Sequence, residues 1–239
     1  MTIFPGFTPE ALAFLRQLKR NNDREWFKAR KAQFDALLLR PMQLFVEEMD
    51  VRLARAVPEI HGSPKRSIFR IYRDTRFSMD KSPYKTHLAC WFPHRRASHG
   101  VGTETHGAGA GYYFHLEPRA SIVAGGIWMP SRPALGAIRD RIAERGGELA
   151  RLLRARALSA RFGELSREGK LTRSPRGYPA DHRHGDLLRH VSFTLSAPVD
   201  DDEVLSAELP RRVERDFVAM RPLVRWLNDA LGYPASSSR

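Results

Sequence analysis

Apolar residues recur at helical spacing in the N-terminal part of the chain. Thr8 can cap a first helix and Pro9 suits its first turn, and leucines then repeat at helical spacing as far as Asn21 and Asn22. A second helix is predicted next, capped by Asn22 or Asp23 and carrying an aromatic and aliphatic stripe. We expect Pro41 to kink or interrupt it, because proline lacks the N–H group that a helix interior uses, before the helix resumes over residues 42–56.

The apolar period changes to two over residues 67–74, which is typical of a half-buried strand. Phe69 and Ile71 are expected on one face and the polar side chains between them on the other. The glycine-rich residues 97–110 are interpreted as a mobile loop, and residues 117–120 as a hairpin turn. Further strands are predicted over residues 86–92, 111–117, 121–128 and 190–196.

The C-terminal part of the chain returns to helical spacing over residues 133–156, with a break at the glycines 146–147, and over most of residues 201–231. Helices, then clustered strands, then helices again indicate an α+β fold, since consecutive strands joined by short connections pair antiparallel. We therefore predict a single domain over residues 4–231, with a central, mostly antiparallel sheet flanked by N- and C-terminal helices. Residues 232–239 are expected to form a loose tail.

Composition narrows the class of protein. The 239 residues are 42% hydrophobic, which is enough for a sizeable core. Cys90 is the single cysteine, so no internal disulfide can form, and its apolar surroundings favour a buried residue over a nucleophile. The chain shows no apolar run of membrane-spanning length and no pattern typical of a secretory leader. We expect a cytoplasmic protein without a membrane partner.

The positive charge is concentrated in one segment. Residues 64–96 carry nine basic and two acidic side chains, which accounts for more than half of the net charge of +13. Such a surplus favours an anionic partner, either a small molecule or, as the second choice, nucleic acid. No helix-turn-helix, zinc-finger or single-strand-binding signature accompanies it. The sequence makes no prediction of oligomeric state.

The centre of this basic segment is the candidate site. Arginine forks bind oxyanions in pairs and lysine adds a point charge, so a turn that gathers them can hold a phosphate or carboxylate. The alternative is an ion-pair lattice in which the two aspartates neutralise the arginines and pin strand to turn. Both alternatives stay open. The candidate ligand-binding residues are Arg70, Tyr72, Arg73, Asp74, Arg76, Asp80, Lys81, Tyr84, Lys85 and His87, with Arg176 approaching from a later loop.

No complete catalytic signature is present, and whether the protein is an enzyme is left open. Tyr84, His87 and His182 are the candidates for proton transfer, the last because Asp181 precedes it in a proline-rich loop. No cofactor is indicated. We predict no metal ligands, because the spacing of the possible ones matches no common metal motif; these are His87, Cys90, His94, His182 and His184.

Five segments together resemble a known family. They read FPGFTPEALAFLRQLKRNNDREWF, FRIYRDTRFSMDKSPYKTH, GYYFHLEP, GGIWMP and SPRGYPADH. The chain resembles domain of unknown function 2461 from about Phe4 to Leu231, and it departs from the family pattern at Arg183 and in the glycine-rich loop. The resemblance implies a single domain of common architecture and no assigned activity.

Three functional hypotheses follow from the residues. The first is a pocket for a phosphorylated or carboxylated small ligand, built on residues 70–87, with or without an enzymatic reaction. The second is non-specific nucleic-acid binding, which the basic segment and the arginine-rich helix over residues 139–156 would favour. The third is a structural or adaptor protein whose basic motif is an ion-pair lattice.

Overall fold

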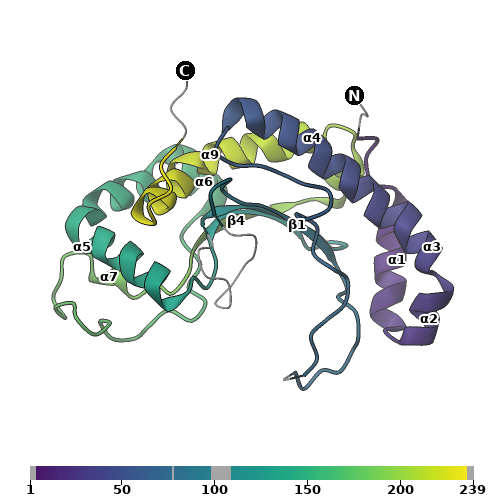
Figure 1. The fold of residues 1–239 in the computed structure, drawn as a ribbon, viewed down its shortest axis with the longest axis horizontal. Helices are drawn as coiled ribbons and strands as arrows, with labels where there is room; N and C mark the ends of the chain where they lie inside the picture. Colours follow the sequence, from purple (N-terminus) through teal and green to yellow (C-terminus); the bar gives the residue numbers. More distant parts are fainter. Residues whose placement is uncertain (1–3, 77, 98–108, 236–239) are drawn as a thin grey trace.

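The computed structural model describes residues 4–76, 78–97 and 109–235 (Figure 1). Most of the predicted loop over residues 97–110, and residues 236–239 of the predicted tail, lie outside this range. The four strands are β1 (Leu88–Phe92), β2 (Gly111–Leu116), β3 (Ser121–Ile127) and β4 (Phe193–Val199). The helices are α1 (Pro9–Arg20), α2 (Arg24–Ala29), α3 (Lys31–Phe34), the π-helical η1 (Asp35–Leu39), α4 (Arg40–Ala56), α5 (Arg132–Arg154), α6 (Arg156–Phe162), α7 (Gly185–Leu188), α8 (Asp201–Leu205) and α9 (Leu209–Ala230).

The strands form one antiparallel sheet in the order β1-β2-β3-β4. Helices from both ends of the chain flank it, so the predicted α+β class and the antiparallel sheet are confirmed. The hairpin turn between β2 and β3 is where it was predicted, with Ala120 N donating to Glu117 O at 3.0 Å. The fourth of these strands was misplaced by three residues, because residues 190–192 form an irregular bend rather than the start of the strand.

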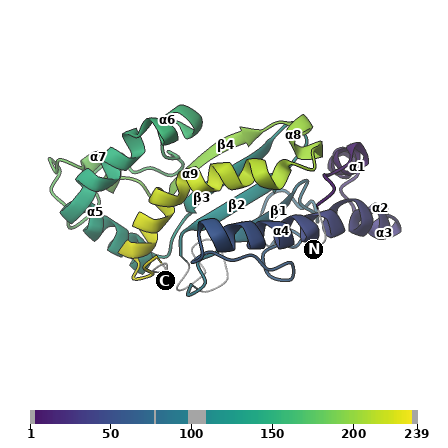
Figure 2. The same ribbon diagram turned by 90° about the horizontal axis from the view of Figure 1, so that it is seen from above.

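One face of the sheet carries the core. Figure 2 shows α4 and α9 lying over this face, which we call the helix-covered face. Alternate residues of each strand are buried there: the ring of Tyr112 stacks on Phe217 of α9 at 4.6 Å between centroids, and Phe114 contacts Phe45 of α4 at 4.8 Å. The period-two pattern of the strands therefore separates a buried face from a second, open one.

Helix α9 approaches β3 closely because β3 carries glycine at the crossing point. A Cβ atom placed on Gly125 would lie 2.9 Å from the sulfur of Met220. The next residue, Gly126, has a φ of +128°, and a Cβ there would lie 1.9 Å from the carbonyl oxygen of Phe193 on β4. At Gly126 the φ angle and the β4 backbone require glycine, whereas at Gly125 a Cβ atom would force the Met220 side chain to shift.

The predicted helix starts and the predicted interruption are both found. The Thr8 hydroxyl accepts a hydrogen bond from Ala11 N, and the Asp23 carboxylate accepts one from Trp26 N at 2.8 Å. Residues Asp35–Leu39 are π-helical immediately before α4, in which Pro41 is the second residue. Because Pro41 has no N–H to donate to the preceding turn, the helix widens there instead of continuing in α-helical geometry.

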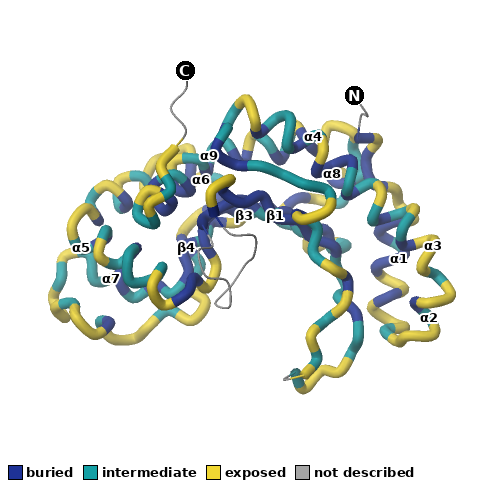
Figure 3. The backbone as a smooth tube through the Cα atoms, in the orientation of Figure 1, coloured by how far each residue is buried: buried dark blue, intermediate teal, exposed yellow. Residues whose placement is uncertain are grey.

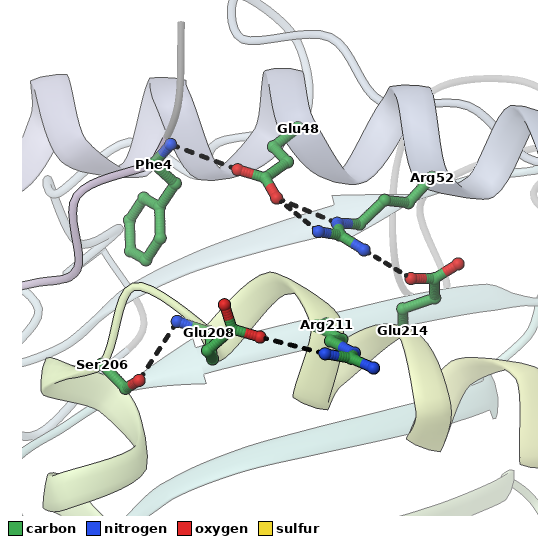
Figure 4. A network of polar contacts seen from close by, with 7 residues as sticks. All are labelled: Phe4, Glu48, Arg52, Ser206, Glu208, Arg211 and Glu214. Carbon is green, nitrogen blue, oxygen red and sulfur yellow. Dashed lines mark hydrogen bonds and ion pairs between the residues drawn. The ribbon is translucent and has the colours of Figure 1, made fainter.

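A polar network joins the N-terminal segment, α4 and α9 (Figure 4). Glu48 accepts a hydrogen bond from Phe4 N at 3.1 Å and two from Arg52, at 2.8 and 2.9 Å. Arg52 also donates to Glu214 of α9 at 2.9 Å. One guanidinium thus joins two helices that are 162 residues apart in sequence.

The long C-terminal helices carry two irregularities. Helix α5 leaves helical geometry at Arg145, next to the predicted break. The ring of His184 lies against Gly146 there, and a Cβ atom on Gly146 would be 2.6 Å from that ring. Helix α9 contains Pro222. Among the residues that the structure describes, no helix combines the length and the apolar composition needed to cross a membrane.

Residues 67–74 differ from their predicted structure. They form isolated bridges, Ile68 with Cys90 and Tyr72 with Tyr84, instead of a regular strand. Together with residues 75–76 and 78–87 they make an extended ribbon that projects from the sheet beside α1, with an exposed tip (Figures 1 and 3). Pro83 and the polar tip residues leave too few consecutive backbone pairs for a continuous ladder, so the strand predicted over residues 67–74 is not formed.

The side chain of Asn22, which lies between α1 and α2, holds the ribbon against the N-terminal helices. The Asn22 side chain donates to Tyr84 O at 2.9 Å and accepts from Tyr84 N at 3.1 Å, as a neighbouring strand would. The Tyr84 ring stacks on Phe27 of α2 with 4.1 Å between centroids. These contacts set the position of residues 85–87 relative to the sheet.

We expect Gly126→Ala to lower the free energy of unfolding by about 3 kcal/mol or more, because it combines an unfavourable φ with a clash against the β4 backbone. Gly136→Ala on α5 is the matched control, since a Cβ there meets nothing within 4 Å. It should raise stability by about 0.5–1 kcal/mol. Urea unfolding followed by circular dichroism measures both, and equal effects of the two substitutions would contradict the packing described here.

We expect Asn22→Ala to cost about 1–3 kcal/mol, because it leaves the backbone N–H and C=O of the buried Tyr84 without these partners. Asn21→Ala is the control; its side chain makes only an exposed hydrogen bond to Gln17 O, so a change within about 0.5 kcal/mol is expected. Trypsin cleavage within the ribbon should also accelerate in the Asn22 variant alone. Unchanged stability and cleavage would show that the ribbon is held elsewhere.

Candidate functional site

A cavity of about 580 Å³ lies on the open face of the sheet. Its floor is formed by alternate residues of the four strands, whose intervening neighbours face α4 and α9. The ribbon forms one wall, and the segment before α7 forms the other. The lining comprises Phe69, Lys85, His87, Ala89, Trp91, Tyr113, Ile122, Ala124, Gly125, Gly126, Trp128, Ser166, Glu168, Thr194 and Ser196.

Strand β1 and the ribbon before it supply the basic side of the cavity. Lys85 and His87 continue the alternation of Ala89 and Trp91, so all four side chains belong to the open face. The Lys85 ammonium lies 5.4 Å from the centroid of the Phe69 ring. Burial lowers the pKa of Lys85, and the neighbouring charge of Arg70 adds to this effect. Within the described part of the chain, Lys85 makes no ion pair with a carboxylate.

Strand β2 places three polar side chains in a row beside His87. The hydroxyl of Tyr113 lies 3.0 Å from His115 Nδ1, and His115 Nε2 lies 3.1 Å from a carboxylate oxygen of Glu117. The rings of His87 and His115 are 4.1 Å apart between centroids. Lys19 of α1 reaches the other oxygen of Glu117 at 3.5 Å.

Burial governs the electrostatics of this row. It lowers the pKa of His87 to about 4, with the neighbouring His115 as the second cause, and it lowers the pKa of His115 despite the hydrogen bond to Glu117. It also raises the pKa of Tyr113 to about 12. Both imidazoles are therefore neutral at neutral pH. An imidazole between a hydroxyl and a carboxylate can pass a proton, and two neutral imidazoles beside a carboxylate can bind a cation.

The opposite wall comes from segments far away in sequence. The indole N–H of Trp128 donates to Glu168 at 3.3 Å, and Ser166 N donates to Thr194 O of β4 at 2.9 Å. Trp128 is 42% exposed although it is large and apolar, and it stands at the rim of the cavity. The cavity is therefore lined both by residues from the centre of the chain and by residues 166–168.

The tip of the ribbon contains the ion pairs that the lattice alternative describes. Arg73 bonds Asp80, and Arg76 bonds Asp74 at 2.7 Å. The hydrogen bonds from Arg76 lower the pKa of Asp74 to about 2, and those from Ser82 and Arg73 lower the pKa of Asp80. Lys81 donates to Thr75 O at 3.0 Å. Among the described basic side chains of the ribbon, Arg70, Lys81 and Lys85 form no ion pair with a carboxylate.

The structure brings part of the predicted site together. A second hollow of about 440 Å³ adjoins the cavity across Lys85 and His87, and Arg73, Asp80 and Tyr84 also line it. Arg70, Asp74, Arg76 and Lys81 line neither the cavity nor this second hollow, and Tyr72 stands 51% exposed over α2. The predicted sheet face carrying Arg70, Tyr72 and Asp74 is therefore wrong, because these residues lie on the ribbon.

Arg176 and His182 lie elsewhere. The segment that carries them docks on α5, where Tyr178 donates to Asp140 at 2.7 Å, at the end of the molecule formed by α5 and α7 and away from the ribbon (Figure 1). His182 Nδ1 accepts a hydrogen bond from His184 N at 3.0 Å. The expected approach of this loop to the basic motif is not found, because its prolines and Tyr178 fold it onto the helix.

The main residues that sequence reasoning missed are Tyr113, His115 and Glu117. They alternate with Tyr112, Phe114 and Leu116, so the strand pattern alone predicts that they share a polar face. Their proximity to His87 depends on the register of β1 against β2, in which Ala89 pairs with His115. Trp128 and Glu168 carry no comparable signal, since their contact joins residues 40 positions apart.

Comparison with known proteins identifies the family but assigns no chemistry to it. No curated protein and no solved structure matches the chain. A family described as "Conserved hypothetical protein (DUF2461)" matches residues 10–226, which include the sheet, α4, most of α9 and both walls of the cavity. The match covers most of the 239 residues, and the chain therefore belongs to this family.

Proposed function

We propose that the protein binds a small organic anion, carboxylated or phosphorylated, in the cavity on the open face of the sheet. Lys85 contacts the anionic group, and the aromatic walls hold the apolar part of the ligand. This refines the sequence-based hypothesis of an anion pocket on residues 70–87. The cavity centres on Lys85 and His87 at the base of the ribbon rather than on the arginines of its tip.

The observation that carries the proposal is the state of Lys85. The ammonium group is partly buried, and this burial lowers the pKa of Lys85. No carboxylate among the described residues neutralises its charge. A desolvated cation without a partner costs free energy, which a bound carboxylate or phosphate would recover. The neighbouring charge of Arg70 raises the potential further. By contrast, Arg73 and Arg76 already have internal carboxylate partners.

The remaining lining suits a ligand with a flat apolar body. Trp91, Tyr113, Phe69 and Trp128 surround a volume of about 580 Å³, within the range of about 300–1,000 Å³ that small-molecule sites occupy. The buried indole N–H of Trp91 has no hydrogen-bond partner in the described structure. Nucleic-acid binding and a purely structural role stay predictions from the sequence.

Lys85→Met should lower the affinity for anilinonaphthalene sulfonate, an aromatic anion, by about tenfold, because one charge-assisted contact is worth about 1.5 kcal/mol or more. Methionine keeps the length of the lysine stem, so packing against Phe69 is retained. Fluorescence titration measures the affinity, and competition by aromatic carboxylates and nucleoside monophosphates then ranks the ligand classes.

Lys81→Met is the matched control, since Lys81 lies on the exposed tip and, among the described residues, donates only to Thr75 O. It removes the same charge without touching the cavity and should leave the affinity within about twofold. Equal losses in the two variants would show that net charge alone attracts the probe. No loss in the Lys85 variant would contradict the proposed anion contact.

A further inference from the structure

We propose that His87, His115 and Glu117 form a binding site for a divalent transition-metal ion, with zinc as the best chemical match. The site does not depend on the anion-binding function proposed above. No spacing motif in the sequence indicates it, because His87 belongs to the ribbon whereas the other two residues belong to β2 and the turn that follows. The cross-strand register brings them together.

The three ligand atoms are close enough for one ion. One imidazole nitrogen of each histidine and one carboxylate oxygen lie within 4.8 Å of one another. Two atoms bound to the same zinc at about 2.0–2.2 Å in tetrahedral geometry lie about 3.4 Å apart. His115 Nε2 and Glu117 Oε2, at 3.1 Å, are already near that spacing. His87 reaches it by a movement of no more than about 1.5 Å, within the reach of side-chain rotation.

The donor set is that of a nitrogen- and oxygen-binding metal. Two imidazoles and one carboxylate suit zinc and neighbouring transition metals, whereas magnesium and calcium prefer oxygen ligands throughout. His87 makes no hydrogen bond or ion pair with another described residue, so both of its nitrogens are available. The two histidines and the glutamate are all partly buried, which favours retention of an ion over its loss to solvent.

The groups around the three ligands also fit a metal site. Ligating histidines usually hydrogen-bond through the nitrogen that does not touch the metal, and ligating carboxylates are usually hydrogen-bonded as well. Tyr113 lies 3.0 Å from His115 Nδ1, the nitrogen opposite the one that faces Glu117. Lys19 lies 3.5 Å from the Glu117 oxygen that is not used. Both partners orient the ligands without occupying the atoms that would bind the ion.

Lys19 also affects how strongly the site would bind a metal ion. Its charge stabilises Glu117 when no metal is bound and opposes a cation when one is. The Lys19 side chain is 69% exposed, so it can leave the carboxylate at little cost. Removing this lysine should therefore strengthen metal binding, whereas a structural role of Glu117 as an ion-pair partner predicts only a loss of stability.

The position of the site connects it to the cavity. His87 lines both the 580 Å³ cavity and the adjoining 440 Å³ hollow. Three protein ligands leave one position of a tetrahedral coordination sphere for water or for a bound molecule, as in catalytic rather than structural zinc sites. An ion held here would be accessible from the open face of the sheet.

The test is metal titration of the full chain after removal of metals with a chelator. We expect one Zn²⁺ per chain by equilibrium dialysis and elemental analysis. Substitution with Co²⁺ should produce the intense visible absorption of a four-coordinate complex. Glu117→Gln, which preserves the shape of the side chain, and His87→Asn should each weaken Zn²⁺ binding at least about a hundredfold. Lys19→Met should strengthen it about threefold or more.

His182→Ala is the matched control, because it removes a histidine that lies away from the site, and its Zn²⁺ affinity should equal that of the unchanged protein. Circular dichroism verifies that each variant is folded, and His115→Ala is added as a third ligand variant. Zinc should raise the melting temperature of the unchanged protein and not that of Glu117→Gln. The proposal is overturned if the unchanged protein binds no Zn²⁺, or if folded Glu117→Gln and His87→Asn bind it as tightly as the His182 control does.

Discussion

The packing of α9 and α4 against one face of the sheet is the interaction on which the rest of the structure depends. Helix α9 reaches β3 because Gly125 leaves room for Met220, and the Arg52 guanidinium joins α4 to α9 above the sheet. Since these helices bury every second residue of the strands, the intervening residues belong to the open face. The cavity, Lys85 and the row on β2 are all consequences of that one-sided covering.

Charge is distributed on the ribbon according to burial. Its exposed tip pairs each aspartate with an arginine, and such pairs contribute little free energy when they face water. At its base, Lys85 and His87 are partly buried. Lys85 has no carboxylate partner there among the described residues, and burial lowers the pKa of His87 to about 4. The same motif therefore contains the ion-pair lattice at one end and an anion-attracting group at the other, so the two sequence-based alternatives describe different parts of it.

Much of the fold could be predicted from the sequence because local chemistry determines it. Thr8 and Asp23 cap helices, Pro41 interrupts one, and the alternation in β2 and β3 predicts strands with a buried face. The candidate site was less predictable, because it depends on contacts between distant residues. The register of β1 on β2 brings His87 to His115, and the docking of Tyr178 on Asp140 carries Arg176 and His182 away from the motif that they were expected to join. No local pattern contains that information.

The ribbon and residues 166–168 have a further consequence for how this protein behaves at high concentration. Backbone groups of β1 bond Ser67 and Phe69, and Thr194 O of β4 accepts a hydrogen bond from Ser166 N, so part of each outer edge of the sheet is already paired. Outer strands with free backbone groups act as templates on which other chains add as strands, the first step toward fibrils. By occupying part of both edges with its own irregular segments, the polypeptide leaves fewer backbone groups of the outer strands on which another chain could add.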